Sequence, residues 1–326
     1  MDRKSQPSCP DCESLNRREF VAKTTGTAVA VSAASVGLSS VASAAPSRKS
    51  AAETAVRKLY DSLNDKQKKL AVLPLTDARR KTINPNWHIT KMRYGMLTGD
   101  QKEICNAVLK GITSEDGYDR FLKQMKHDAG SINTYSFALF GNPHEKEFEF
   151  EWTGRHLTLR ADGNTKKGVA FGGPIVYGHG AKGNSKKNLF SYQTMAVNKV
   201  FKMLDEKQRE KALLKKAPSE GAVKLRKKGR RMPGISVGDL SSDQQGRFEK
   251  SLRAVMKPYR KEDVDEVMEI VKASGGLKKV SLAFYQTGDL NKDKVWDIWR
   301  IEGPSMVCHF RGAPHVHAYI NIAKRS

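Results

Sequence analysis

The chain has 326 residues and a formal charge of +23, from 58 lysines and arginines against 35 aspartates and glutamates. That length is enough for one large domain, or two ordinary ones, with a hydrophobic core. Apolar residues make up 38% and aromatic residues 8% of the chain, which excludes a mainly disordered protein. Four cysteines in a chain of this length exclude a small scaffold held together by disulfides.

Residues 1–44 have the pattern of a twin-arginine export signal. The run Arg17-Arg18-Glu19-Phe20-Val21-Ala22-Lys23 precedes a weakly apolar stretch of small residues, which ends in Ala42-Ser43-Ala44, a sequence that signal peptidase accepts. We therefore expect the twin-arginine translocase and signal peptidase as partners during export, and a periplasmic or extracellular location. The alternative is a disordered basic tail, and the pattern leaves open whether the signal is cleaved or kept as an anchor.

Removal of the signal changes the composition of the chain very little. Residues 1–44 carry five basic and four acidic side chains, so almost all of the positive charge belongs to the mature part. No other apolar run reaches the about 20 residues that span a bilayer, and we expect no transmembrane segment once the signal is cleaved. Cys105 and Cys308 are the cysteines that remain, and they either pair in an oxidising compartment or are simply buried.

Four short elements of the mature chain predict helix starts. Each has a leucine, a capping residue and a glutamine three residues after the cap, and the cap–glutamine pairs are Asn64–Gln67, Thr98–Gln101, Asp205–Gln208 and Ser241–Gln244. This is the capping box, in which the cap side chain accepts from the third helical N–H and the glutamine accepts from the N–H of the cap. The intervals of 34, 107 and 36 residues are irregular, so we interpret the elements as repeated use of one helix start and not as a solenoid.

Strand signals fall in two blocks, at about 132–178 and 279–322. In the first block Phe148, Phe150 and Trp152 alternate with glutamates, and the alternation resumes after Thr153-Gly154-Arg155, which predicts a hairpin with one apolar and one polar face. The second block has apolar runs at 279–287, 294–302, 305–311 and 315–322. Because helices lie between the blocks, we expect a single α+β domain over residues 45–326 with a mainly antiparallel sheet and capping-box helices packed against it.

A basic segment interrupts this domain at about 215–239. Its cations are concentrated within 215–231, and aromatic residues are absent among them. A platform that stacks nucleic-acid bases is therefore not supported, and no specific nucleic-acid partner is expected. The segment is either a solvated linker or a surface that binds an anionic envelope polymer or lipid.

Three histidines near the C-terminus predict a metal site. After Ser305 to Arg311, the turn Gly312-Ala313-Pro314 leads into a strand that begins at His315. If the loop has three residues, Arg311 faces His315 and His309 faces His317, so that His309, His315 and His317 share one surface. Such a set of nitrogen ligands suits a divalent transition metal, with Zn, Fe and Cu all allowed. The alternative is that these are hydrogen-bonding histidines on a sheet, and a change in loop length would misalign His309.

The remaining histidines are weaker candidates. His156 lies beside glutamates in the first strand block and is our candidate for a fourth ligand or for the catalytic acid/base, if the two blocks adjoin. His144 and His179 lie in turns and are open to the same roles, whereas His88 and His127 have no feature that favours one. Glycine-rich phosphate loops, a Gly-x-Ser-x-Gly elbow and a His-Glu-x-x-His helix are absent from the sequence.

Three stretches resemble a known family, the domain of unknown function numbered 3500. Trp299-Arg300-Ile301-Glu302-Gly303-Pro304 is similar to its Tyr-Arg-Ile-Gln-Gly-Pro, Pro314-His315-Val316-His317 to its Asn-His-Ile-His, and Gly154-Arg155-His156-Leu157-Thr158-Leu159 to its Gly-His-His-Leu-Ser-Leu. The similarity spans about residues 55–323 and implies export and a shared fold, with no activity attached.

Two departures from the family pattern concern the candidate site. Arg155 replaces the first histidine of the family's His-His pair, and His309 stands where the family usually has glutamate. A change from glutamate to histidine keeps a residue type that ligates metals, which favours the predicted cluster.

Two functions follow from these observations. The first is an exported metal-dependent enzyme, in which a metal-bound hydroxide makes hydrolysis the natural reaction and an oxygen-using iron or copper site is equally allowed. The second is a non-catalytic envelope protein whose basic surface binds an anionic polymer or lipid.

Overall fold

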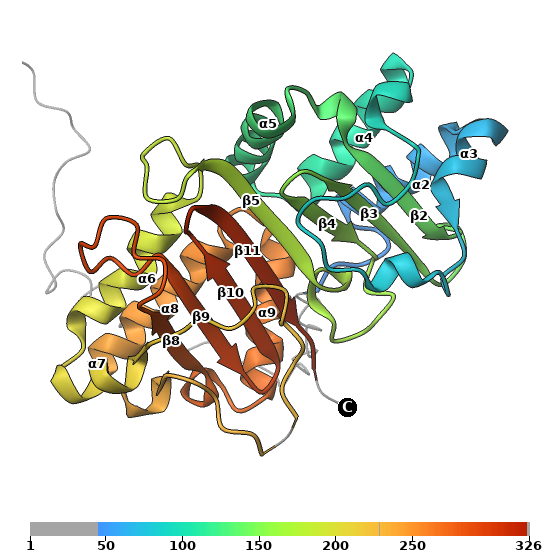
Figure 1. The fold of residues 1–326 in the computed structure, drawn as a ribbon. Helices are drawn as coiled ribbons and strands as arrows, with labels where there is room; N and C mark the ends of the chain where they lie inside the picture. Colours follow the sequence, from blue (N-terminus) through green and yellow to red (C-terminus); the bar gives the residue numbers. More distant parts are fainter. Residues whose placement is uncertain (1–44, 228, 325–326) are drawn as a thin grey trace, which may run out of the picture. The chain divides into compact units, whose positions relative to one another are not determined.

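The computed structural model describes residues 45–227 and 229–324, so the predicted export signal at 1–44 lies outside the described residues. Its centre is one sheet with the strand order β1-β2-β3-β4-β5-β11-β10-β9-β8-β6, with β7 paired to β8 (Figure 1). All pairs are antiparallel except β1–β2 and β6–β8. The predicted α+β class with a mainly antiparallel sheet is therefore confirmed. The strands are β1 (Val72–Leu73), β2 (Ser136–Gly141), β3 (Phe148–Gly154), β4 (Leu157–Ala161), β5 (Ile175–Lys182), β6 (Leu213–Leu214), β7 (Ile235–Ser236), β8 (Ser281–Tyr285), β9 (Ile298–Gly303), β10 (Met306–Arg311) and β11 (His315–Ile322).

All four predicted capping boxes are present, each with both of its hydrogen bonds. They start α3, α4, α7 and α8. The helices are α2 (Ala51–Ser62), α3 (Asp65–Ala71), α4 (Gly99–Ile112), α5 (Glu115–Ala129), α6 (Ser191–Met203), α7 (Glu206–Ala212), α8 (Ser242–Met256) and α9 (Lys261–Ala273). Of these, none is long and apolar enough to cross a membrane.

Residues 51–182 and 191–322 fold as two similar halves. Each half runs through two helices and a two-residue strand, a long connection, two more helices and four strands of the sheet. The last strands of the halves, β5 and β11, pair antiparallel at the centre of the sheet, and the strand order is symmetric about that pair.

The capping boxes follow the same duplication. The side-chain amides of Gln67 and Gln101 bond each other at 2.9 Å in the first half, and those of Gln208 and Gln244 do so at 3.2 and 2.8 Å in the second. The four helix starts are thus two matched pairs, and their interpretation as simple reuse of one helix start missed an internal repeat.

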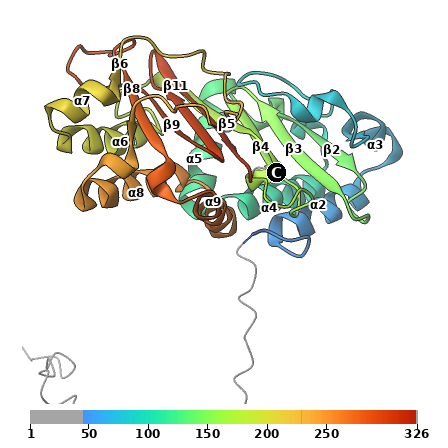
Figure 2. The same ribbon diagram turned by 90° about the horizontal axis from the view of Figure 1, so that it is seen from below.

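The helices lie on one face of the sheet, as Figure 2 shows. Their apolar sides and that face form one core, which includes Trp152 of β3 and Trp299 of β9, both fully buried. Burial of an aromatic or large aliphatic side chain contributes about 1.5–3 kcal/mol, so this layer supplies most of the stability. Cys105 and Cys308 are buried there as free thiols, so of the two alternatives from the sequence they are simply buried.

The opposite face of the sheet is covered by two connections. Residues 73–93 pack on β2 through Ile89 and Trp87, and the polar face predicted for the β3–β4 hairpin is buried beneath this connection. There Glu149 and Glu151 lie against Arg160, each at most 3% exposed. The polar face of the hairpin therefore forms a buried ion-pair cluster.

The second connection is the basic segment, which has mostly exposed side chains and contacts the sheet at a few positions. Val223 is fully buried against Val307 and Tyr319, and the side chain of Asn321 donates to its carbonyl at 2.8 Å. Arg226 pairs with Glu302 of β9, so one cation of the basic segment is neutralised at the sheet. The 215–227 segment is held on the sheet by apolar and ionic contacts.

The register of the C-terminal hairpin differs from the predicted one. Arg311 is paired with His317, and His309 is paired with Tyr319, not with His317. The turn is longer because its residues bond to neighbouring elements: the N–H of Gly312 donates to Asp297 and the carbonyl of Pro314 accepts from Gly183. The slip is two residues, and because side chains alternate with a period of two, His309 stays on the same face but moves away from His317.

Candidate metal centre

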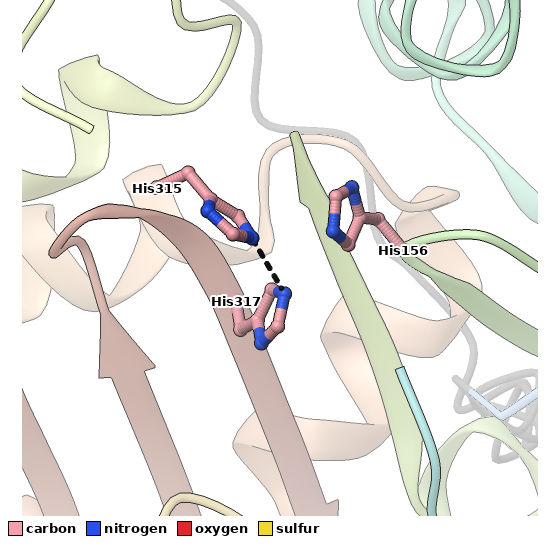
Figure 3. Close-up of side chains that lie close together, drawn as sticks. All are labelled: His156, His315 and His317. Carbon is pink, nitrogen blue, oxygen red and sulfur yellow. Dashed lines mark hydrogen bonds between the residues drawn. The ribbon is translucent and has the colours of Figure 1, made fainter. Parts of the chain in front are cut away.

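Three imidazoles converge across β5, two from β11 on one side of it and one from the β3–β4 turn on the other. His156, His315 and His317 each offer a ligating nitrogen, and these three atoms lie within 4.8 Å of one another. The Nε2 atoms of His315 and His317 are 3.1 Å apart (Figure 3). The ring centroid of His156 lies 5.0 Å from the ring centroid of His315 and 4.9 Å from that of His317. His156 and His317 are buried and His315 is half-buried.

The β3–β4 turn brings His156 into this group. Arg155 and His156 form a two-residue turn, and His156 has a positive φ of 57°, a conformation in which histidine is more frequent than most residues. The hydroxyl of Tyr135 and the amide of Gln124 both donate to the carbonyl of Arg155, at 2.7 and 2.9 Å. The turn is therefore held from the helix layer.

Pairing of β5 with β11 places the other two imidazoles. His317 lies opposite Gly178. A Cβ at Gly178 would meet the Val316 carbonyl at 2.2 Å and the His317 ring at 3.2 Å. Only glycine therefore allows the backbone of β5 to lie this close to the imidazole of His317.

Two carboxylates orient the imidazoles from behind. The Nδ1 atom of His156 is 2.7 Å from Asp128, at the end of α5, and the Nδ1 atom of His317 is 3.3 Å from both oxygens of Glu220, in the 215–227 segment. Arg311 pairs with the same Glu220 at 2.7 Å. Because each carboxylate favours a proton on Nδ1, Nε2 of His156 and of His317 is the nitrogen whose lone pair can bind a metal.

Burial favours the neutral form of His315 and His317, which is the form that binds metal. It lowers the pKa of His315 to about 4, with a further contribution from His317, and it also lowers the pKa of His317. Burial raises the pKa of Asp128, but hydrogen bonds from His156, Gln124 and His127 outweigh it and hold that pKa well below its usual value. Asp128 is thus a carboxylate that accepts hydrogen bonds throughout the neutral range.

His127, Asp128 and His179 form a neighbouring group, again with one ligating atom each within 4.8 Å. The Nδ1 atom of His179 accepts the N–H of Leu189 at 3.1 Å, so a neutral His179 carries its proton on Nε2 and presents a donor. The oxygens of Asp128 already accept from His127, His156 and Gly180. These hydrogen bonds therefore indicate that His127, Asp128 and His179 form a polar wall beside the first histidine group and not a second metal site.

The structure separates the predicted site residues. His315 and His317 meet His156, but His309 is not a member of either histidine group among the described residues. It is buried beside Arg300 and Tyr319, its pKa is lowered to about 3 by burial and then by Arg300, and its Nδ1 atom has no partner in the described part of the chain. His144 lies elsewhere, exposed and paired with Asp61.

Two carboxylates of the candidate site, Asp128 and Glu220, could not be recognised from the sequence. No local pattern marks them, because Asp128 lies in the last turn of a helix and Glu220 in an irregular basic segment. Only the packing of these elements around the sheet shows that each carboxylate faces a histidine. His127, which had no favourable feature in the sequence, also acquires one through Asp128.

The comparisons with known proteins identify a family. Residues 46–322 match the family described as "Protein of unknown function (DUF3500)". The match covers most of the chain, and the chain belongs to that family, which confirms the resemblance noted in the sequence. Neither the curated proteins nor the solved structures include a match.

Proposed function

We propose that the protein binds one transition metal through His156, His315 and His317. The observation that carries this proposal is the convergence of three imidazoles, two of which have a carboxylate on the opposite nitrogen. Two nitrogens bound to tetrahedral zinc at 2.0–2.1 Å lie about 3.3 Å apart, close to the 3.1 Å between His315 and His317. The His156 position replaces His309 of the earlier prediction.

Three protein ligands favour a catalytic over a structural site. Structural zinc sites use four protein ligands, whereas catalytic sites leave a position for water or substrate. A bound metal would lower the pKa of that water toward about 7, which supports metal-dependent hydrolysis as the reaction. The neutral His179 donor and the exposed His127 beside Asp128 line the same region and suit hydrogen bonding to a substrate. Iron or copper chemistry remains allowed by three imidazoles.

Metal analysis of the full chain, purified without a histidine tag, tests this proposal. We expect about one equivalent of a first-row metal per chain, retained in a His144→Ala control because His144 contacts Asp61 and lies outside the group. A protein that contains no metal and binds none on titration contradicts the proposal. If such a protein binds polyanions in a strongly salt-dependent way, the result favours the non-catalytic envelope protein, whose exposed cations include Lys215, Lys216 and Lys224.

Export by the twin-arginine route stays a proposal that the sequence alone supports. Exchange of both Arg17 and Arg18 for lysine keeps the charge but removes the guanidinium pair that defines the signal. We expect the exchanged chain to accumulate in the cytoplasm, measured by cell fractionation against the parent chain. Equal export of both chains would show that residues 1–44 are not a twin-arginine signal.

A further inference from the structure

The β8–β9 connection carries a regular series of oxygen donors. Asp289, Asn291, Asp293, Val295 and Asp297 alternate with other residues, which places donors at positions 1, 3, 5, 7 and 9 of the loop. In calcium loops of the Asp-x-Asn-x-Asp type, positions 1, 3 and 5 bind through side chains and position 7 through its carbonyl. The metal centre does not use any of these residues.

The loop backbone curls around its first aspartate. The carboxylate of Asp289 accepts from the N–H groups of Asp293 and Lys294, at 3.2 and 3.1 Å. Lys294, at the sixth position, has a positive φ of 62°, the conformation for which calcium loops use glycine at this place. The two lysines of the loop, Lys292 and Lys294, are exposed.

A buried and incompletely bonded carboxylate closes the loop. Asp297 is only 1% exposed, and its Oδ2 atom accepts the N–H of Leu290, which holds the carboxylate against the turn. Its Oδ1 atom is buried without a hydrogen-bond partner among the described residues. Burial, together with the negative charges of Asp289 and Asp293, raises the pKa of Asp297 to about 6. A buried carboxylate oxygen beside two other carboxylates is stabilised by a cation.

The closing end of the loop is rigid, because its neighbours are anchored. The side chain of Asn198 accepts from the N–H of Trp296 at 2.8 Å and donates to its carbonyl at 2.9 Å, and the carbonyl of Asp297 accepts from Gly312 at 2.8 Å. In the other half of the repeat, the β2–β3 connection at 142–147 is shorter and has no such series. The loop is therefore an addition to one half that the shared fold does not require.

We propose that residues 289–297 form a Ca²⁺ site, with the side chains of Asp289, Asn291, Asp293 and Asp297 and the carbonyl of Val295 as ligands. All donors are oxygens, which suit Ca²⁺ and not the softer metals that imidazoles bind. The glutamate that supplies two oxygens at position 12 of an EF-hand is replaced by Arg300, which points into the buried ion pairs with Glu302. We therefore expect weak binding, with a dissociation constant of about 10⁻⁴–10⁻³ M, as in extracellular calcium modules.

Calorimetric titration of the full chain with Ca²⁺, after removal of metals by a chelator, tests the site. We expect one saturable Ca²⁺ per chain, and binding at least tenfold weaker in Asp293→Asn and in Asp297→Asn. Asp65→Asn, which removes an exposed carboxylate in the first turn of α3, is the matched control and is expected to bind like the parent chain. Circular dichroism checks that each variant is folded, and Asp289→Asn at the half-buried start of the loop replaces Asp297→Asn if that variant does not fold.

The outcomes separate this proposal from the metal centre. A His315→Ala/His317→Ala variant is expected to keep its Ca²⁺ binding, because it changes no loop residue. The proposal is overturned if the parent chain shows no saturable Ca²⁺ binding, or if the loop variants bind Ca²⁺ as tightly as the parent.

Discussion

Replacement of both His315 and His317 by alanine is expected to abolish stoichiometric binding of the transition metal. The double variant leaves His156 as the last imidazole of the group, and one imidazole cannot hold a metal in competition with water. Metal content after dialysis measures the effect. His309→Ala, on the neighbouring strand and the same face, is the matched control and is expected to retain the metal. If the single variant His309→Ala also loses the metal, the ligand set predicted from the sequence is restored.

Asp128→Asn is expected to weaken binding of the transition metal without abolishing it. The variant keeps all three imidazoles but loses the charge that orients His156 through its Nδ1 atom. Loss of such a carboxylate partner costs about 10–100-fold in metal affinity. Competition with a chromophoric chelator measures the change. An affinity equal to that of the parent chain would mean that Asp128 does not support a metal ligand.

Arg260→Met is expected to destabilise the fold more than any single surface change. The guanidinium of Arg260 makes a bidentate pair with Glu53 of α2, at 2.8 and 2.9 Å, and a further bond of 2.9 Å with Asp263 of α9. All three residues are buried, so the variant leaves two carboxylates without a counter-charge. Removal of one partner from such a cluster costs about 3–5 kcal/mol in the free energy of unfolding. Urea denaturation measures this loss.

Arg253→Met is the matched control, because Arg253 pairs with Glu249 on an exposed helix face. A surface pair of this kind contributes about 0.3–0.5 kcal/mol.

The loss in Arg260→Met is also expected to be larger at pH 8 than at pH 5. Burial already raises the pKa of Asp263 to about 7, so protonation favours the folded state below that pH, and the stabilisation is lost as the pH rises through the folded pKa. Equal losses in the two variants would show that the buried cluster contributes no more than a surface pair.

Local chemistry explains why much of the fold could be predicted. A capping box satisfies its hydrogen bonds within four residues, so Asn64–Gln67 and its three counterparts needed no tertiary information. Strand alternation is similarly local, and the runs at 305–311 and 315–322 correspond closely to β10 and β11. The pairing of the two halves could not be predicted, because β5 and β11, the strands that join them, are far apart in the sequence.

The candidate site shows where local patterns stop being sufficient. His315 and His317 share a face because side chains alternate along a strand, and this holds whatever the strand pairs with. The third imidazole depended on the register of one turn, and the bonds of Gly312 and Pro314 to neighbouring elements moved His309 by two residues. His156, distant in the sequence, took its place because β5 pairs with β11 and the β3–β4 turn lies beside them.

The sequence by itself determined the helix starts, the strand segments, the α+β class and the histidine pair on β11, since each rests on interactions within a few residues. Only the tertiary structure decided which imidazole joins that pair, which carboxylates orient it and which cations of the basic segment are neutralised. Asp128, Glu220 and Arg226 act across the fold, on His156, His317 and Glu302 respectively. Their partners are set by how the elements pack around the sheet, and that packing is a property of the whole chain and not of any one segment.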